Sequence, residues 1–502
     1  MRPRRSRRPA EPAPPFWKSD TLFALLLFAV ALAPRLYVAF HYVHEPVWDG
    51  HYYDFGARRI AHGLGYSDDL AVDGGTIWHP WCHYPVGYSA YLAIFYRLFG
   101  DGLLVAPVVN AATGALLALA TWLLARHALV TWRARTAGLI VALHPGLILY
   151  SGLVMSEPLA ALLTLLAFWL AVRDVQPRGM MTGAFVLGVA ALVRPQALLC
   201  APFLAMLTPR TPEDTPLTPG RVAVRRIASI VVVCLLTLVP VLPWTARNCR
   251  VMDGCALVST NAGWNLAIGS FPRATGRFET LRSSDGCREV TGQVQQDRCW
   301  FAYGLAQIRV DPKRWLELVP KKLGYTFDHE SFAVEYLREA SPSQWPEDRR
   351  VAVRLLVSTF HRILVVAAAL ACVALRLKGK SAWVQGAMLG VVGLVGLVPN
   401  FAGVPTFWPL VVMTSVVLWL PIPGRAPLAP ALRLPLALLT TTVLTHAVFF
   451  GEDRYHVVVV PVLAMLAASA LRRPAEEKPT LELAPDSTDA LDDGWDDEPA
   501  FD

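Results

Sequence analysis

The chain has 502 residues, of which 54% are hydrophobic and only 17% are charged, and its mean hydropathy is +0.40. Soluble proteins of this size carry roughly a quarter charged residues, so the composition excludes an ordinary soluble enzyme and favours a polytopic membrane protein. The net charge of +7 does not predict a nucleic-acid partner, because the arginines lie in short segments between apolar runs, where they act as topology signals.

The first 20 residues are basic, and an apolar run follows from Thr21 to Val43. A cleaved signal peptide is one interpretation of this pattern. The run is longer than a signal peptide requires, however, and no Ala-x-Ala site closes it. Because a run of this length can cross a bilayer, we expect a retained signal anchor with residues 1–20 in the cytoplasm.

Apolar runs recur along the rest of the chain, and they predict an all-α membrane protein with about twelve spans. The runs 180–194 and 195–208 could also form one span, since only Arg194 and Pro195 interrupt that apolar stretch. A single span there would invert every later loop. The twelve runs are 21–43, 103–126, 134–153, 157–173, 180–194, 195–208, 227–246, 351–375, 382–400, 402–420, 434–450 and 455–471.

The distribution of basic residues assigns a side of the membrane to each loop. With twelve spans, every predicted cytoplasmic segment is basic: residues 1–20, 126–135, 173–178, 210–226, 376–380, 425–433 and 472–473. The long loops 44–102 and 247–350 then lie outside the cytoplasm. Arginine outnumbers lysine, and the chain is rich in alanine, proline and valine. Because of this composition we expect a bacterial inner-membrane protein with a multi-pass topology.

Two further segments have distinct predicted roles. The apolar stretch Tyr88–Phe99 is too short to span, so it is expected to form an interfacial helix. The tail, residues 472–502, is acidic and poor in apolar residues, which predicts a disordered cytoplasmic extension.

Four of the eight cysteines fall in the predicted outer loop 247–350. In an oxidising compartment, pairing by proximity predicts the disulfides Cys249–Cys255 and Cys287–Cys299. Zinc ligation is the alternative, which the spacing disfavours because it is not CxxC. Cys82 is left without a predicted partner.

The segment from Trp48 to Asp54 is the most polar stretch near a predicted membrane boundary, and it contains Asp49, His51 and Asp54. A carboxylate at the outer lip of a span is costly unless it is used. An ionised Asp there could take a proton from a hydroxyl group. The alternative is structural: Asp49 or Asp54 could cap a helix.

Other polar residues fall at the same predicted face, and a helix bundle could bring them to one cavity. Acids and arginines together suit a substrate that has a phosphate and a hydroxyl nucleophile. Each of these residues also has a simpler interpretation. The arginines, and Arg35 within the first span, could snorkel to lipid headgroups. Glu157 could be an acid in the first turn of a helix, where the helix dipole favours it, and the histidines could be surface residues. The set is Asp49, Asp54, His79, His83, Tyr84, Glu157, Arg194, Arg247, Asn248, Arg454, Tyr455 and His456.

The order of these segments resembles the lipid-linked-sugar-dependent glycosyltransferases of the GT-C class. The nearest resemblance is to glycosyltransferase family 39, the dolichyl-phosphate-mannose–protein mannosyltransferase-like group with its aminoarabinose-transferase relatives. It covers residues 20–471, and it is carried by Asp49, His83–Ser89, Tyr150–Glu157, Leu192–Pro195, Pro243–Asn248, Ser259–Leu266, Arg454–His456 and Pro461.

The resemblance implies a catalytic helix bundle over residues 21–471 with an extracytoplasmic active site. The donor would be a sugar on a polyprenyl phosphate, transfer would be inverting, and the acceptor would be a lipid, glycan or protein. Asp49 corresponds to the catalytic acid of that family, and Glu157 to a second functional acid. This chain departs from the pattern at Gly50, where many relatives have Glu, and at Val86, where many have a second Pro.

Within this interpretation Arg454 binds the donor phosphate with Arg194 and Arg247 as helpers, and Gly451 allows a sharp turn before it. The supporting residues are Asp54, His51, His83, Tyr84, Asn248 and Tyr455. A divalent metal is possible, with His83, His329 and Glu330 as candidate ligands. The alternative function is a transporter or flippase of a lipid-linked or anionic substrate, but no repeated halves or charged mid-membrane helices are evident.

Overall fold

The structure is a computed structural model that describes residues 19–174, 176–208, 219–280, 282–373, 382–402, 406–421 and 428–471. This part of the chain is helical, as predicted, apart from one two-stranded hairpin. The basic N-terminus up to residue 18, the predicted cytoplasmic loop 376–380 and the acidic tail 472–502 lie outside the described residues.

The N-terminal half sets two short helices and the hairpin between the first two long helices. Its elements are α1 (Asp20–His41), α2 (Asp49–Ala61), β1 (Ser67–Val72), β2 (Gly75–Pro80), α3 (Val86–Phe99), α4 (Val105–Ala125), α5 (Thr131–Ala142), α6 (Pro145–Leu149), η2 (Tyr150–Gly152), α7 (Glu157–Arg173), α8 (Pro177–Val193), η3 (Pro195–Cys200) and α9 (Ala201–Leu207).

The C-terminal half places a group of short helices between two sets of apolar ones. Its elements are α10 (Pro219–Leu238), α11 (Leu242–Val251), α12 (Ala262–Ile268), η4 (Ser283–Asp285), η5 (Cys287–Glu289), α13 (Gln293–Val310), α14 (Pro312–Phe327), α15 (Phe332–Ala340), α16 (Glu347–Val373), α17 (Ala382–Ala402), α18 (Trp408–Val417), α19 (Pro430–Val448), η7 (Asp453–Val459) and α20 (Val460–Ala470).

Each predicted apolar run falls on one or more of these helices. Five helices of the described part are long and apolar enough to cross a membrane: α1, α4, α16, α19 and the continuous pair η7–α20. Two bent pairs, α6–η2 with α7 and α10 with α11, raise the number to seven. Four more apolar helices are shorter, so length and composition alone do not confirm the predicted number of twelve.

Small residues allow the central helices to pack closely. α4 packs against α1, α5 and α7, and it buries a series of alanines on those faces. Gly138 of α5 makes room for Leu27 and Trp122, because a Cβ at that glycine would lie 2.9 Å from each side chain. Such small residues are favoured between membrane helices, where close backbone approach supplies the packing energy.

Arg35 does not snorkel, so the sequence-based expectation for this residue was wrong. Its side chain is fully buried between α1 and α4, and Gly114 of α4 leaves the space that it occupies. Its guanidinium donates to the carbonyls of Ala142 at 2.6 Å and Val141 at 3.0 Å. These carbonyls end α5 and have no partner within that helix, so the buried cation completes the helix terminus.

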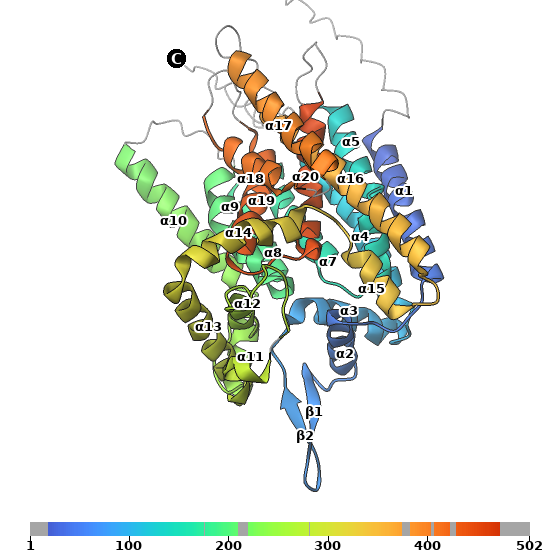
Figure 1. The fold of residues 1–502 in the computed structure, drawn as a ribbon, viewed down its shortest axis with the longest axis vertical. Coiled ribbons are helices and arrows are strands. Elements are labelled where there is room, and N and C mark those ends of the chain that lie inside the picture. Colours follow the sequence, from blue (N-terminus) through green and yellow to red (C-terminus); the bar gives the residue numbers. More distant parts are fainter. Residues whose placement is uncertain are drawn as a thin grey trace, which may run out of the picture.

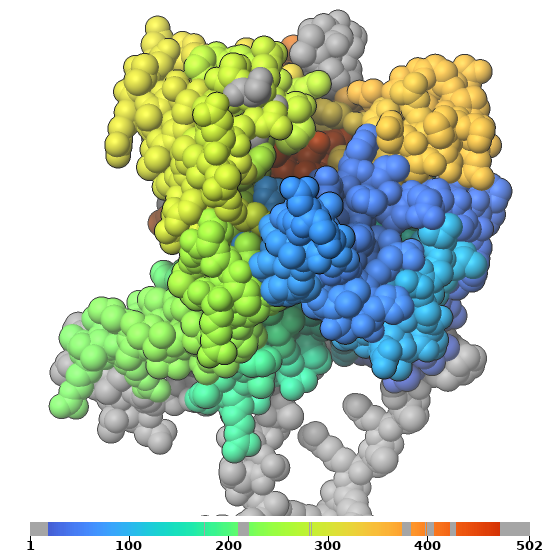
Figure 2. All heavy atoms as spheres, turned by 90° about the horizontal axis from the view of Figure 1, so that it is seen from below, coloured from blue at the N-terminus to red at the C-terminus, as the bar shows by residue number. Residues whose placement is uncertain are grey.

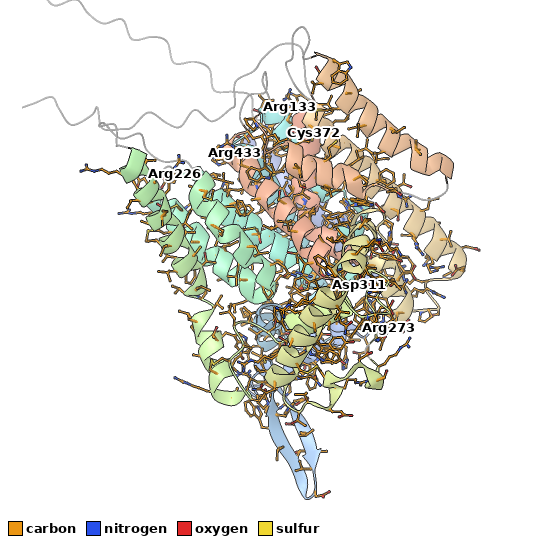
Figure 3. The ribbon with its side chains drawn as sticks, turned by 60° about the vertical axis from the view of Figure 1, so that its left-hand side comes forward. Arg133, Arg226, Arg273, Asp311, Cys372 and Arg433 are labelled. Carbon is orange, nitrogen blue, oxygen red and sulfur yellow. A yellow bond between two sulfur atoms is a disulfide. The ribbon has the colours of Figure 1, made fainter. Side chains whose placement is uncertain are left out.

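The polar segments gather at one end of the molecule (Figure 1). The hairpin, α2, α11, α12 and α13 lie at that end, and α17 and the start of α10 lie toward the other. Arg133, Arg226 and Arg433, which belong to predicted cytoplasmic segments, lie far from the hairpin, whereas Arg273 and Asp311 of the predicted outer loop lie nearer to it (Figure 3). The predicted inner and outer residues labelled there therefore separate along the long axis.

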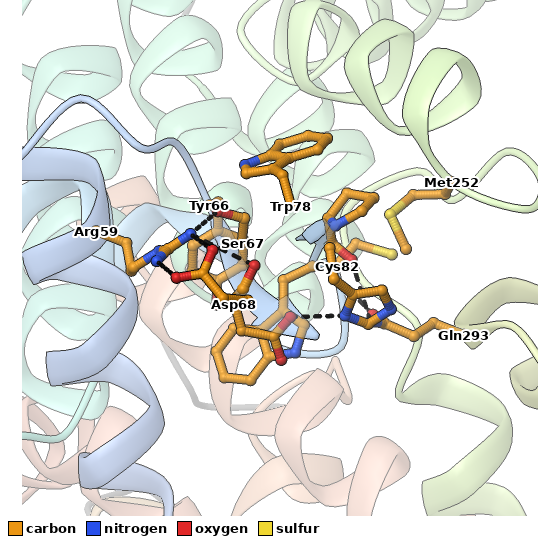
Figure 4. A network of polar contacts seen from close by, with 12 residues as sticks. Arg59, Tyr66, Ser67, Asp68, Trp78, Cys82, Met252 and Gln293 are labelled. Atoms are coloured by element: carbon orange, nitrogen blue, oxygen red, sulfur yellow. Dashed lines mark hydrogen bonds and ion pairs between the residues drawn. The ribbon is translucent and has the colours of Figure 1, made fainter. Parts of the chain in front are cut away.

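The base of the hairpin is anchored to both halves of the chain (Figure 4). Arg59 of α2 binds the carboxylate of Asp69 in two places, at 2.6 and 2.9 Å. On the other side, the backbone amide of Cys82 donates to the side chain of Gln293 in α13 at 2.9 Å. The hairpin therefore connects α2 to the C-terminal part of the predicted outer wall.

Both predicted disulfides, Cys249–Cys255 and Cys287–Cys299, are present. The first closes a short turn after α11, and the second joins η5 to α13. Cys82, Cys200 and Cys372 are buried and form no disulfide. Between the two bridges in the chain lies α12, which packs against α13 and forms one wall of the site described next.

Candidate active site

Asp49 is the first residue of α2, and the backbone before it is strained. Trp48 has φ of +50°, a left-handed value that a bulky residue adopts only when its surroundings enforce it. The Trp48 ring is held between Phe332 and Tyr336, with ring centroids 5.5 and 5.7 Å away.

The Asp49 carboxylate has two side-chain partners. Its Oδ1 accepts a hydrogen bond of 2.9 Å from the Tyr84 hydroxyl, and its Oδ2 pairs with the guanidinium of Arg454. No side-chain cap bond is present at this helix start. The helix-cap interpretation of Asp49 is therefore wrong, and the carboxylate belongs to a polar cluster built from distant parts of the chain.

Arg454 lies at the start of η7, between two acids and two rings. Besides Asp49 it pairs with Glu452 at 2.6 Å, and its guanidinium lies 5.2 Å from the centre of the Phe332 ring and 5.1 Å from that of Tyr455. Only 13% of the side chain is exposed. A snorkelling arginine would extend away from such partners, so that interpretation is wrong for Arg454.

A second ion pair joins Glu157, the first residue of α7, to Arg194, which follows α8. The separation is 2.6 Å, and the carboxylate is fully buried. Arg194 also lies 5.3 Å from the centre of the Tyr455 ring, on which Arg454 packs as well. Two guanidinium groups therefore share one aromatic ring, and each has its own carboxylate.

The two ion pairs, Tyr84 and Tyr455 line a single cavity of about 350 Å³. Viewed from the hairpin end, the surface is hollowed between the blue N-terminal segment and the yellow-green segment, and red atoms of the C-terminal part lie at its floor (Figure 2). The polar lining residues are Asp49, Tyr53, His83, Tyr84, Glu157, Arg194, Gln196, Asn261, Asn265, Thr445, His446, Arg454 and Tyr455.

Burial and neighbouring charges set the protonation of this lining. Burial by itself would raise the pKa of Asp49, but the charge and hydrogen bond of Arg454 and the Tyr84 hydroxyl outweigh it and hold that pKa below its ordinary value. Burial lowers the pKa of His83, which is therefore neutral at pH 7. Beside Arg454, burial raises the pKa of Glu452 to about 7.

Asp54 and His51, two predicted supporting residues, do not line the cavity. Asp54 is buried on the other face of α2, where it accepts from the Tyr96 hydroxyl and pairs with Arg58 at 2.6 Å. His51 is exposed and stacks on Phe55. The position of Asp54 agrees with a role in fixing α2 against α3.

Arg247 and Asn248 were also predicted for the site, and they too lie outside the cavity lining. Arg247 donates to the carbonyls of Trp81 and Tyr66, both at 2.7 Å, and packs on Trp244. Asn248 is fully buried and donates to the Ala256 carbonyl. Because the Arg247 guanidinium is occupied by backbone carbonyls, we withdraw it as a phosphate ligand.

The three candidate metal ligands are not brought together. His83 lines the main cavity, and His329 lines a smaller one of about 220 Å³ with Glu452 and Asp453. Glu330 instead meets His361 and His456, the one group of three ligand-type side chains found in the described ranges. Neither His83 nor His329 belongs to it.

Two glycines near the site have packing roles that the sequence does not reveal. Gly50 lies under the Tyr336 hydroxyl, which any Cβ at position 50 would overlap. A side chain at position 50 would force Tyr336 to shift, so the packing at this position favours glycine over a second acid. Gly451 does not have a positive φ, so a sharp turn does not explain the glycine at this position. Close packing does, because a Cβ at position 451 would overlap the Lys322 carbonyl oxygen.

Several polar lining residues were not predicted for the site, namely Tyr53, Gln196, Asn261, Asn265, Thr445 and His446, although Asn261 and Asn265 lie in Ser259–Leu266, which carries the family resemblance. His446 had a usable signal, because a histidine inside an apolar run is rare without a role. Tyr53 lies among several tyrosines of one segment, and nothing in the sequence separates it from Tyr52. Gln196 follows Arg194 by two positions and shares its exposure to the cavity.

No protein-family model matches the sequence, and no curated protein matches it. Among solved structures, the chain is similar to the oligosaccharyltransferase of Archaeoglobus fulgidus, with 12% identity, a TM-score of 0.44, and coverage of 90% of this chain and 49% of that one. It is similar to ArnT from Cupriavidus metallidurans bound to undecaprenyl phosphate, with 16% identity, a TM-score of 0.35, and coverage of 89% and 78%.

It is also similar to the arabinosyltransferase EmbB from Mycobacterium smegmatis, with 12% identity, a TM-score of 0.30, and coverage of 89% and 42%. The chain thus spans about half the length of the oligosaccharyltransferase that it matches. All three are glycosyltransferases of the GT-C class, which the sequence itself resembles.

Proposed function

We propose that the chain is a membrane glycosyltransferase that moves a sugar from a polyprenyl-phosphate donor to an acceptor hydroxyl or amine in the cavity beside Asp49. The observation that carries the proposal is the pair of arginine–carboxylate contacts, Asp49–Arg454 and Glu157–Arg194, at one cavity among apolar helices. Such a site offers a proton acceptor and two cations for a phosphate.

The cations suit a phosphate that is tethered to a lipid. Arg454 and Arg194 lie at the ends of apolar helices, where a polyprenyl tail could remain in the bilayer while its phosphate enters the cavity. Both pack on Tyr455, which keeps the two guanidinium groups near each other. An arginine can contact two phosphate oxygens through its planar fork, which a lysine cannot.

Asp49 is the proposed base. Its lowered pKa keeps it ionised at neutral pH, and the Tyr84 hydrogen bond fixes one of its oxygens. The acceptor gives its proton to Asp49 while its oxygen or nitrogen forms the new bond to the anomeric carbon. The bond from that carbon to the phosphate oxygen breaks, and polyprenyl phosphate leaves with the electron pair. One displacement of this kind inverts the anomeric centre.

Phosphate is a fair leaving group, so the remaining requirement is stabilisation of its developing charge. Arg454 and Arg194 are placed for this role. Glu157 accepts from Arg194 and is buried behind it, so we assign Glu157 to holding that cation in position. The basic segments at the opposite end support a cavity on the extracytoplasmic side of a bacterial inner membrane.

The test is transfer from a radiolabelled polyprenyl-phosphate sugar in membranes that contain the full chain, screened over several donor sugars. Asp49→Asn keeps the size of the side chain but cannot accept the proton, so transfer should fall roughly a hundred- to ten-thousand-fold. Donor binding should change little in comparison.

Asp54→Asn is the matched control, since it makes the same change five positions later on α2, on the other face and outside the cavity. It should cost less activity than Asp49→Asn. Transfer by Asp49→Asn within a few-fold of the wild type would remove Asp49 as the base. Absence of transfer from every donor, with substrate movement across vesicles instead, would favour a transporter.

A further inference from the structure

A second polar cluster lies inside the helix bundle, away from the cavity. It consists of His144 before α6, Glu330 before α15, His361 in α16 and His456 in η7. All four side chains are buried, with exposed fractions of 0%, 2%, 0% and 0%. None of them lines the cavity beside Asp49. The proposed transfer reaction gives these groups no role.

Two histidines in the cluster present a free nitrogen toward the same point. His456 Nδ1 lies 2.7 Å from the Thr326 carbonyl, and His361 Nε2 lies 2.9 Å from the Phe327 carbonyl. A carbonyl only accepts, so each of these nitrogens carries the proton. The other nitrogens, His456 Nε2 and His361 Nδ1, are buried and have no hydrogen-bond partner within the described part of the chain.

Glu330 supplies a carboxylate at that point. Both of its carboxylate oxygens are buried without a hydrogen bond from any described residue, although the backbone of Glu330 is held by Ser358. The carboxylate fits against Gly146, where a Cβ would overlap Oε1. A buried carboxylate without a partner is unfavourable by several kcal/mol or more, so the site calls for a cation or a proton.

The spacing favours a shared cation. Glu330 Oε2 lies 3.7 Å from His456 Nε2, which is too far for a hydrogen bond. Ligand atoms at about 2.1 Å from one tetrahedral ion are about 3.4 Å from each other. The three ligand atoms of Glu330, His361 and His456 all lie within 4.8 Å, so a small inward movement brings them to such an ion.

His144 completes the surroundings of the carboxylate. Its Nδ1 accepts from the Leu147 amide at 3.3 Å, so a neutral His144 carries its proton on Nε2. That nitrogen faces Glu330 Oε2 at 3.7 Å. At that distance His144 does not hydrogen-bond to the carboxylate, but it lies beside it and outside the ligand set, where groups next to metal ligands commonly lie.

We propose that Glu330, His361 and His456 bind one divalent transition-metal ion, for which zinc is the best fit. Two imidazoles and one carboxylate form a donor set that zinc favours, and they are poor ligands for Mg²⁺ or Ca²⁺, which prefer oxygen alone. The site differs from a catalytic one in that it is buried and does not open into the cavity beside Asp49.

The ion would join three segments near the site, since its ligands come from the loop before α15, from α16 and from η7. Asp453 already accepts from the backbone amides of Ser331 and Phe332 and from the Ser331 hydroxyl, next to Glu330. His456 follows Arg454 by two residues on the same 3-10 helix. The proposed role is structural: the ion fixes η7 against α15 and α16.

Metal content of the purified full chain tests the proposal. The protein is isolated through a tag without histidines and without chelators, and its metals are measured by inductively coupled plasma mass spectrometry. The wild type should contain about one equivalent of zinc. Glu330→Gln and His361→Ala should each lower that content at least about tenfold. His329→Asn, which alters the histidine beside Glu330 but outside the cluster, should retain it.

A second measurement avoids variants that fail to fold. The wild-type chain is stripped with 1,10-phenanthroline and refilled with Co²⁺, whose visible spectrum should show the bands of a low-symmetry site with imidazole ligands. Stripping should lower the thermal unfolding temperature, and zinc should restore it. A wild-type chain that holds under about a tenth of an equivalent and takes up neither zinc nor cobalt would overturn the proposal in favour of a protonated Glu–His pair.

Discussion

At the scale of single residues, the site depends on where one guanidinium points. Arg454 reaches Asp49, Glu452 and Tyr455 from one position, and it is almost fully enclosed. We assign the donor phosphate to it. When a donor binds, the Arg454 guanidinium would exchange some of its contacts with Asp49, Glu452 and Tyr455 for contacts with phosphate oxygens.

Arg454→Ala should weaken apparent donor affinity roughly ten- to hundredfold, because a charge-assisted hydrogen bond contributes about 1.5–3 kcal/mol. Arg454→Lys keeps the charge but loses the fork, so it should fall between wild type and Arg454→Ala. Donor titrations of transfer measure both. Arg250→Ala, a change at an exposed arginine of α11, is the control. Unchanged donor affinity in Arg454→Ala would leave the phosphate without this partner.

Gly50 leaves space for the Tyr336 hydroxyl, because it has no side chain. Gly50→Ala should destabilise the fold by about 1–3 kcal/mol, since the new methyl group overlaps the Tyr336 hydroxyl. Tyr336→Phe removes that hydroxyl and the bond that it accepts from the Val47 amide. Thermal unfolding of the double variant should therefore show partial recovery relative to Gly50→Ala. A double variant less stable than either single one would reject the steric explanation.

At the scale of elements, the segment Gly451–His456, which carries Arg454, contacts three other parts of the chain. Gly451 pairs with Gly276 through a backbone bond of 2.9 Å, Asp453 holds the start of α15, and His456 stacks on His361 of α16 with ring centroids 3.9 Å apart. A short 3-10 helix has little stability of its own, so these contacts determine its position.

Glu452 in this segment should make stability depend on pH. Burial raises its folded-state pKa to about 7 from an ordinary value of 4.5, so the unfolded chain releases the proton first. Stability from this group is present below pH 4.5 and declines as pH rises toward 7. Relative to Glu452→Gln, the wild type should therefore lose thermal stability across that interval and then level off.

Thermal unfolding at a series of pH values between 4 and 8.5 measures this difference. Glu347→Gln serves as the control, because Glu347 is exposed and its pKa lies below the ordinary value, next to Arg350. The difference between that variant and the wild type should not change between pH 5 and 7. A Glu452→Gln difference that is equally flat would show that Glu452 is ionised throughout.

At the scale of the whole molecule, the polar segments and the predicted cytoplasmic arginines lie toward opposite ends (Figures 1 and 3). This separation is what a bilayer across the middle requires. The candidate cavity lies with the hairpin and the disulfide-bonded segment, in agreement with an oxidising outer compartment.

We expect Ser343→Cys, an exposed position in the predicted outer loop, to react with a membrane-impermeant maleimide in intact cells or spheroplasts. Ser487→Cys in the predicted cytoplasmic tail should react only after the membrane is permeabilised. Background labelling should be low, because three of the four cysteines outside the disulfides are buried. Labelling of the tail from outside would overturn the predicted topology and the location of the site with it.

The sequence by itself determined the helical class, the apolar runs and the two disulfides, and it pointed to several residues that line the candidate cavity. These features are local or depend on composition: a run of apolar residues in a membrane must form a helix, and nearby cysteines in one outer loop pair with each other. Asp49, Glu157, Arg194 and Arg454 could be selected because charge beside an apolar run is costly and therefore informative.

Tertiary structure alone decided which of those charges meet. Asp49 and Arg454 are separated by 405 positions, and nothing in the sequence pairs them in preference to Asp49 and Arg247. It also decided that Arg247 binds backbone carbonyls, that Arg35 completes a helix end, and that Glu330 faces two histidines rather than His83. The physical reason is that an ion pair or a metal site depends on distance in space, and helix packing, which sets that distance, is determined by side-chain shapes along whole interfaces.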